Sequence, residues 1–202
     1  MSVWQSIVGI MKMYKKVFKR LFDVSLAVIL LMPALILCCV AILAIYAEDG
    51  APAIFKQVRV GRHKIPFMMF KLRTMAKSTE SRASDEVSSS QITKMGLFLR
   101  KLKIDELPQL INVLKGEMSF VGARPCLPSQ DILINERESL GVLRERPGIT
   151  GPAQIAGVDM SSPHELAVID ANYNRTITLS NDIKYMIQTA TGGGRGDAVR
   201  TG

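Results

Sequence analysis

The chain is poor in the residue types that build disulfide-bonded and metal-binding proteins. Its 202 residues include 3 cysteines, 2 histidines and 1 tryptophan. Cys38 and Cys39 are adjacent within an apolar run and Cys126 stands alone, so the cysteines form neither a disulfide framework nor a metal-ligand pattern. A reducing, cytosol-facing location fits this usage. We assign no role to His63 or His164.

Long apolar runs are also scarce, with one exception. The run 24–46 has 23 residues, of which 21 are apolar, and no second stretch approaches membrane length. A multi-span transporter is therefore excluded. With 48% hydrophobic residues and no internal repeat, the chain is neither wholly disordered nor fibrous. Its length favours a single globular domain beside the apolar run.

The positive charge is concentrated around the apolar run. The net charge is +8, and residues 1–64 contain nine basic and three acidic side chains. Basic groups beside an apolar segment favour attraction to anionic membrane lipid, at about 1 kcal/mol per Lys or Arg near the surface. Because these groups bracket the run and follow no motif helix, we do not expect nucleic-acid binding.

Two features of the apolar run favour a re-entrant membrane helix. The alternative is a spanning helix, since 23 helical residues extend about 34 Å. However, Pro33, next to Met32, removes a hydrogen bond near the middle of the run. Basic residues also flank both ends, which places both on the cytoplasmic side. We therefore expect a helix over 21–47 that breaks at Met32–Pro33, preceded by an interfacial amphipathic helix over 1–20.

The remaining chain predicts a small cytosolic α/β domain over 48–190, mostly α with a short β-hairpin. Alternating Phe, Val and Met residues predict paired strands over 54–60 and 67–73. Apolar spacing predicts helices over three ranges, namely 92–102, 105–114 and 127–144. We expect Lys115–Gly116 to end the second of these helices.

Three further segments lack apolar periodicity. The polar stretch 76–90 predicts a mobile surface loop, and the Pro- and Gly-containing stretch 146–152 predicts a rigid turn-rich loop. The glycine-rich stretch 191–202 predicts a disordered tail.

Asp105 and Glu106 are adjacent acids at a predicted helix start. We expect Asp105 to be the N-cap, where backbone N–H groups favour its anion. Adjacent helical side chains point about 100° apart, so the two acids do not form a proton-sharing dyad. Phosphate also binds at helix starts, where Arg100 and Arg124 could hold its oxygens. Alternatively, Asp105 only caps the helix, Glu106 is a solvated acid in its first turn and the arginines are surface charges.

Five segments, taken together and in this order, resemble motifs of the bacterial monotopic phosphoglycosyl transferases, the sugar transferases that begin polyprenol-linked glycan assembly. They are KRLFD at 19–23, FKLRTM at 70–75, DELPQL at 105–110, NVLKGEMS at 112–119 and RPGITG at 146–151. The resemblance covers 15–190. The sequence departs from the family at Met32 (usually Ser), at Ala123 (usually Pro) and at Pro152 (frequently Trp).

The resemblance implies a two-step reaction on the cytoplasmic face of the bacterial inner membrane, with Mg²⁺ as cofactor. Asp105 would attack the β-phosphorus of a UDP-sugar and release UMP. Polyprenyl (undecaprenyl) phosphate would then attack the phosphosugar intermediate. Asp105 and Glu106 would both be catalytic residues and metal ligands. Basic residues would bind the substrate phosphates, namely Lys71, Arg73, Arg100, Arg124 and Arg146.

Other interpretations of the same residues are a membrane-anchored, non-catalytic scaffold and a one-step transferase in which Glu106 is the base. The presence of both acids argues against the scaffold. Lys71 and Arg73 could equally line a solvated strand edge, and Glu117 could be structural. A homodimer is a further expectation.

Overall fold

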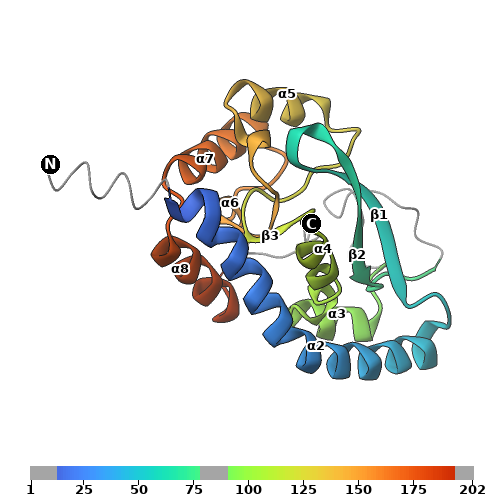
Figure 1. The fold of residues 1–202 in the computed structure, drawn as a ribbon. Coiled ribbons are helices and arrows are strands. Elements are labelled where there is room, and N and C mark those ends of the chain that lie inside the picture. The colour runs from blue at the N-terminus through green and yellow to red at the C-terminus, as the bar shows by residue number, and fades with distance from the viewer. Residues whose placement is uncertain (1–12, 78–90, 194–202) are drawn as a thin grey trace, which may run out of the picture.

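The computed structural model describes residues 13–77 and 91–193 (Figure 1). Three predicted segments lie mostly outside these residues, namely the helix over 1–20, the loop over 76–90 and the tail over 191–202. A π-helical turn, Tyr14–Phe18, runs directly into the long helix α2, Lys19–Asp49. Figure 1 shows α2 extending along one side of the molecule, beside the other helices.

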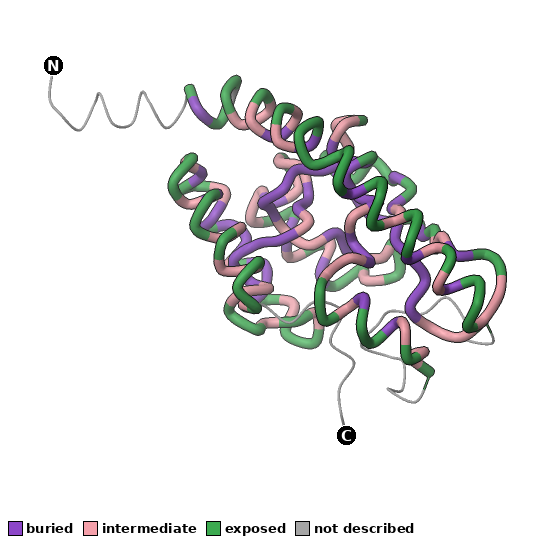
Figure 2. The backbone as a smooth tube through the Cα atoms, turned by 90° about the horizontal axis from the view of Figure 1, so that it is seen from below, coloured by how far each residue is buried: buried purple, intermediate pink, exposed green. Residues whose placement is uncertain are grey.

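The helix α2 directs its smaller residues toward the protein and its larger ones outward. Its buried residues recur at helical spacing and include three alanines, Ala27, Ala34 and Ala41. The outward residues are large and aliphatic, and Ile29 and Leu43 are 69% and 68% exposed. Figure 2 shows this outer face exposed along most of the helix. A helix in a soluble core has the opposite arrangement, and α2 is long and apolar enough to cross a membrane.

Pro33 does not interrupt the helix. Helical structure continues through Met32–Pro33, from Lys19 to Asp49, and the ribbon of α2 changes direction along its length (Figure 1). The re-entrant course of this helix stays a prediction. Both Ile29, whose carbonyl would accept the missing bond, and Pro33 lie on the exposed face. The proline therefore leaves the packed face of the helix undisturbed.

The predicted hairpin is confirmed to within one residue. Strand β1, Ile54–Val60, pairs antiparallel with β2, Pro66–Leu72. A short 3₁₀ turn, Arg62–Lys64, joins them. Met69 and Leu72 are buried, so β2 contributes to the core on which the site is built.

Two short helices and a tight turn follow the hairpin. Helix α3, Lys94–Lys101, begins at Thr93, whose hydroxyl accepts a hydrogen bond from the Gly96 nitrogen at 2.9 Å. Gly96 lies so close to the Thr74 carbonyl that a Cβ atom would not fit. A 3₁₀ turn, Ile104–Glu106, leads into α4, Gln109–Lys115, which ends at Gly116 as predicted.

Asp105 is not the N-cap of a helix, contrary to the prediction. Helix α4 begins four residues later, and its N-cap is Pro108. The cause is Lys103, whose left-handed backbone (φ 56°) ends the preceding helix and tightens the chain into the 3₁₀ turn. Asp105 and Glu106 therefore lie inside a turn rather than at a helix terminus.

The last third of the chain contains more regular structure than expected. Strand β3, Ser119–Val121, pairs in parallel with β4, Gly148–Thr150, where only a turn-rich loop was predicted. The backbones approach closely because Gly148 has no Cβ to strike Gly122. The predicted helix over 127–144 is shorter, since a left-handed Gly141 separates α5, Asp131–Ser139, from a 3₁₀ turn, Val142–Arg144. Three further helices complete the described fold, namely α6 (Pro152–Ala156), α7 (Pro163–Arg175) and α8 (Leu179–Ala190).

A buried ion pair holds α5 against α7. Arg137 and Asp170 are 2.7 Å apart, and each side chain is 1% exposed. Arg137 also donates a hydrogen bond of 2.8 Å to the Arg124 carbonyl. The pair of helices α5 and α7 thereby positions the segment that contains Arg124 and follows β3.

We predict that Arg137→Ala lowers the free energy of unfolding by about 3–5 kcal/mol, because it leaves Asp170 as an unpaired buried charge. The matched control is Lys64→Ala, which breaks the exposed Lys64–Glu138 pair and should cost under about 1 kcal/mol. Urea-induced unfolding in a neutral detergent measures both. An equal loss of unfolding free energy in the two variants would contradict a stabilising role for the buried Arg137–Asp170 ion pair.

Candidate active site

The two adjacent acids lie in the 3₁₀ turn between α3 and α4. Asp105 is 4% exposed and Glu106 is 8% exposed. Burial of an ionised carboxylate is costly unless partners compensate its charge. The surface-acid alternative is therefore wrong, and the partners of these acids define the site.

Glu106 is compensated by two basic residues from distant segments. Lys71 on β2 places its Nζ 3.1 Å from Glu106 Oε1, and both Arg124 terminal nitrogens lie 3.4 Å from the same oxygen. Lys71 is only 5% exposed, so it does not lie on a solvated strand edge. The fold thus brings together Lys71, Glu106 and Arg124, which the sequence separates by as much as 53 positions.

A third basic residue, Lys103, belongs to the same group of charges. Burial lowers the pKa of Lys103 from the ordinary lysine value. Glu106 and, less strongly, Asp105 oppose that decrease in pKa, whereas Arg124 adds to it. Its Nζ also donates to the carbonyls of Thr189 and Gly193, at 3.2 and 3.0 Å. Sequence reasoning overlooked Lys103, although its position two residues before Asp105 was a signal.

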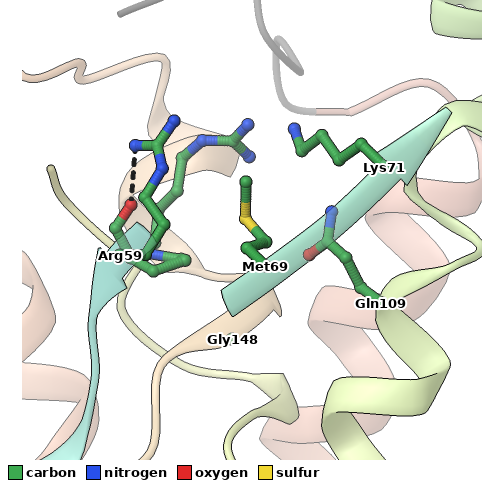
Figure 3. Close-up of a pocket in the computed structure, with 7 residues that line it drawn as sticks. Arg59, Met69, Lys71, Gln109 and Gly148 are labelled. Atoms are coloured by element: carbon green, nitrogen blue, oxygen red, sulfur yellow. Dashed lines mark hydrogen bonds between the residues drawn. The ribbon is translucent and has the colours of Figure 1, made fainter. Parts of the chain in front are cut away.

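Lys71 and Arg124 line a small open pocket together with Arg59 and Gln109. Figure 3 shows Lys71 and Gln109 reaching from β2 and α4 toward the same space. Gln109 is 2% exposed, and its side-chain nitrogen has no hydrogen-bond partner among the described residues. Arg59 donates to Gln57 Oε1 at 2.6 Å and to the Pro125 carbonyl at 3.1 Å. These converging donors suit an anionic, oxygen-rich ligand.

Arg59 and Gln109 were also missed by sequence reasoning. Gln109 is part of the DELPQL segment that carries the family resemblance, so the motif itself contained a signal. Arg59 lies within the predicted first strand, and no local pattern distinguishes it from the other basic residues near the apolar run.

Three of the predicted phosphate-binding residues have other contacts. Arg73 donates to carbonyls in the segment after α2, those of Gly50 (2.8 Å) and Pro52, and forms an ion pair with Asp49 at 3.0 Å. Arg100 Nε donates to the Thr74 hydroxyl at 2.8 Å. Arg146, considered below, lines a different cavity. The roles of these three residues toward substrate stay predictions.

The assignment of Asp105 and Glu106 as ligands of Mg²⁺ stays a prediction. The described residues contain no group of three or more His, Cys, Asp or Glu side chains arranged to hold a metal. Mg²⁺ commonly binds one or two carboxylates and completes its shell with water and substrate phosphates. Asp105 and Glu106 beside a pocket of anion donors fit that mode of binding.

Comparison with known proteins establishes the family. The model of the bacterial sugar transferase family matches residues 14–194. An uncharacterized sugar transferase, EpsL, of Bacillus subtilis is 38% identical over 86% of this chain and 85% of its own length. The chain therefore belongs to the bacterial sugar transferase family, which confirms the resemblance of its motifs, and it is an enzyme of the phosphoglycosyl transferase class.

Two further relatives have names that specify a reaction. A UDP-glucose:undecaprenyl-phosphate glucose-1-phosphate transferase of Caulobacter vibrioides is 36% identical over 85% of this chain and 67% of its own length. A protein of the same name in Escherichia coli is 36% identical over 86% of this chain, which spans 39% of that longer relative.

We predict that the pKa of Lys103 responds in opposite directions to two substitutions. In the wild type it lies below the ordinary value of 10.5 because the amine is buried. Glu106→Gln should lower it further by removing an anion, and Arg124→Gln should raise it by removing a cation. The measurement is the pH dependence of Lys103 acylation, followed by peptide mass spectrometry. The pH midpoint of acylation is compared between the variants, and the absolute rate is not, because burial of Lys103 also slows access of the acylating reagent. Shifts of the same sign would contradict the charge arrangement.

Proposed function

We propose that this enzyme transfers a sugar 1-phosphate from a UDP-sugar to polyprenyl (undecaprenyl) phosphate through a covalent phosphosugar–Asp105 intermediate. The observation that carries the proposal is the buried acid pair, held beside basic groups that converge on a pocket. The names of the relatives from Caulobacter and Escherichia coli support the donor and acceptor classes.

In the first step an Asp105 oxygen attacks the β-phosphorus of the UDP-sugar. The bond from that phosphorus to the bridging oxygen breaks, and UMP leaves with this oxygen and its electron pair. The product is a mixed anhydride between Asp105 and the sugar phosphate. A carboxylate suits this role because it is ionised at neutral pH and needs no separate base.

The neighbouring residues stabilise the charges of this step. Lys71 and Arg124 fix the Glu106 side chain by ion pairs, and they line the pocket for the diphosphate together with Arg59 and Gln109. When bound, Mg²⁺ would be held by Asp105 and Glu106 and would offset the repulsion between carboxylate and diphosphate. Positioning and electrostatic stabilisation are the main catalytic contributions in phosphoryl transfer.

In the second step an oxygen of polyprenyl phosphate attacks the same phosphorus and the Asp105–phosphorus bond breaks. The product is a polyprenyl diphosphate sugar, and the Asp105 carboxylate is regenerated. The acceptor is a membrane lipid, so the site must lie near headgroup level. The outward aliphatic face of α2 supports that placement, with the protein on the cytoplasmic face of the inner membrane.

Exposed apolar side chains on two other helices also support a membrane-adjacent surface. On α3, Leu97 and Phe98 are 56% and 54% exposed, and on α8, Ile187 is 57% exposed. Apolar side chains that stand out from short polar helices are typical of helices lying in the membrane interface. We propose that α3 and α8 contact the same leaflet as a re-entrant α2.

We predict that Asp105→Asn abolishes the covalent intermediate and lowers UMP release by at least about 10³-fold, because the nucleophile is lost. Purified protein in detergent is incubated with Mg²⁺ and a panel of UDP-sugars, without acceptor. The Asp105 peptide of the wild type should gain the mass of a phosphosugar. The control, Asp131→Asn, changes an exposed acid on α5 and should form the adduct normally.

The trapping experiment separates the covalent route from its competitors. UMP release only when polyprenyl phosphate is present, with no adduct on Asp105, would favour the one-step reaction with Glu106 as base. Folded protein that releases no UMP from any UDP-sugar with or without acceptor would overturn the proposed activity.

A second prediction concerns topology. In a variant lacking the native cysteines, Met13→Cys and Lys56→Cys should both react with an impermeant maleimide in inverted vesicles and not in spheroplasts. The two positions flank α2, and both are exposed. Labelling of the two cysteines from opposite sides would show that α2 spans the bilayer. A permeant maleimide reports whether each cysteine is reactive at all.

A further inference from the structure

A second cavity lies at the amino end of α2. It opens to solvent. Its wall shares no residue with the pocket of Lys71 and Arg124. Four basic and two acidic side chains line it, namely Lys15, Lys19, Arg20, Arg146, Asp23 and Glu145.

The two arginines of this cavity are held by neutral acceptors. Arg20 donates to the carbonyls of Val113 and Leu114 at 2.6 and 3.1 Å, and Arg146 Nε donates to the Gly116 carbonyl at 2.7 Å. These carbonyls belong to the carboxyl end of α4, where cations are favoured. Within the described residues neither guanidinium forms an ion pair, so the carbonyls orient both groups without neutralising them.

The nearby carboxylates are engaged by the two lysines. Lys15 forms an ion pair with Glu145 at 2.9 Å, and Lys19 forms one with Asp182 at 2.7 Å. Asp182 also accepts hydrogen bonds from the hydroxyls of Tyr14 and Tyr173, at 2.8 and 2.5 Å. Asp23, the remaining acid of the cavity, accepts a hydrogen bond from the Phe120 nitrogen at 3.2 Å. Among the described residues, none of these acids is ion-paired with Arg20 or Arg146.

The electrostatics of Arg146 show the same surplus of positive charge. Burial lowers the pKa of Arg146, and the neighbouring Arg20 and Arg62 lower it further. Asp23 and Glu145 act in the opposite direction and rank below those two arginines among its causes. A partly buried cation that other cations repel is stabilised by a bound anion.

We propose that this cavity binds a phosphate-bearing anion, either the headgroup of an anionic phospholipid or a soluble phosphate. The terminal nitrogens of Arg146 and the remaining N–H groups of Arg20 offer paired donors that match phosphate oxygens. The cavity adjoins the point where the apolar run begins. This inference does not depend on the proposed reaction at Asp105.

The test uses charge reversal of two comparable lysines. Lys15→Glu places a second carboxylate beside Glu145 at the cavity, and Lys64→Glu makes the same change beside Glu138 on the distant hairpin turn. Both lysines are exposed and paired with glutamate, so the net charge changes equally. Circular dichroism checks that each variant is folded, and Lys15→Gln serves in place of Lys15→Glu if the latter is not.

Two measurements distinguish the sources of phosphate. In the first, full-length protein from nanodiscs containing phosphatidylglycerol and phosphatidylcholine is washed in neutral detergent, and retained lipid is quantified by mass spectrometry. In the second, inorganic phosphate is titrated against lipid-free protein at constant ionic strength, and the thermal unfolding midpoint is followed.

We expect Lys15→Glu to retain at least about 10-fold less phosphatidylglycerol, or to bind phosphate at least about 10-fold more weakly, than Lys64→Glu and wild type. Loss in the lipid measurement alone identifies a headgroup site, and loss in the phosphate measurement identifies a site for the soluble ion. The proposal is wrong if wild type, Lys15→Glu and Lys64→Glu all retain the same amount of phosphatidylglycerol and all bind phosphate with the same affinity.

Discussion

The carboxylate of Glu106 is the contact on which the arrangement of the site depends. It is 8% exposed and accepts hydrogen bonds from Lys71 on β2 and from Arg124 after β3. An ionised carboxylate at that depth is stable only if such partners are present. The hairpin, the turn between α3 and α4, and the segment after β3 must therefore meet at one place. Arg137 reinforces this constraint, because it ties the Arg124 backbone to the buried pair between α5 and α7.

The long helix α2 and the turn that contains Asp105 and Glu106 are connected through α4. The amino end of α4 is next to Asp105 and Glu106, and its carboxyl-terminal carbonyls receive Arg20 from α2. At the other end of α2, Arg73 binds the segment 49–52 and joins it to β2. The long helix is thus fastened to the globular part at both ends, while its larger side chains face outward. This geometry supports a site held at a constant distance from the lipid surface.

The molecule contains two groups of basic side chains with different environments. In the first, Lys71 and Arg124 compensate the buried Glu106 and line the pocket that Arg59 and Gln109 also line. In the second, Arg20 and Arg146 are oriented by helix carbonyls and face an open cavity. The proposed reaction on a phosphorylated lipid would use the first group to bind the reacting phosphates, and the second group would bind the phosphate of an anchoring anion.

The sequence by itself determined the apolar helix, the bounds of the two hairpin strands to within one residue, the end of α4 at Gly116, and the family to which the chain belongs. These features depend on local patterns: apolar length, strand alternation, a left-handed glycine and contiguous motifs. Only the tertiary structure decided which basic residues meet the acids. Arg124 reaches Glu106, whereas Arg146 reaches Gly116 and Arg73 reaches Asp49. Local spacing cannot encode such choices, because they depend on how β2, α4 and β3 pack together. The course of α2 at Pro33 was decided in the same way, since only packing shows that the proline lies on the free face of a continuous helix.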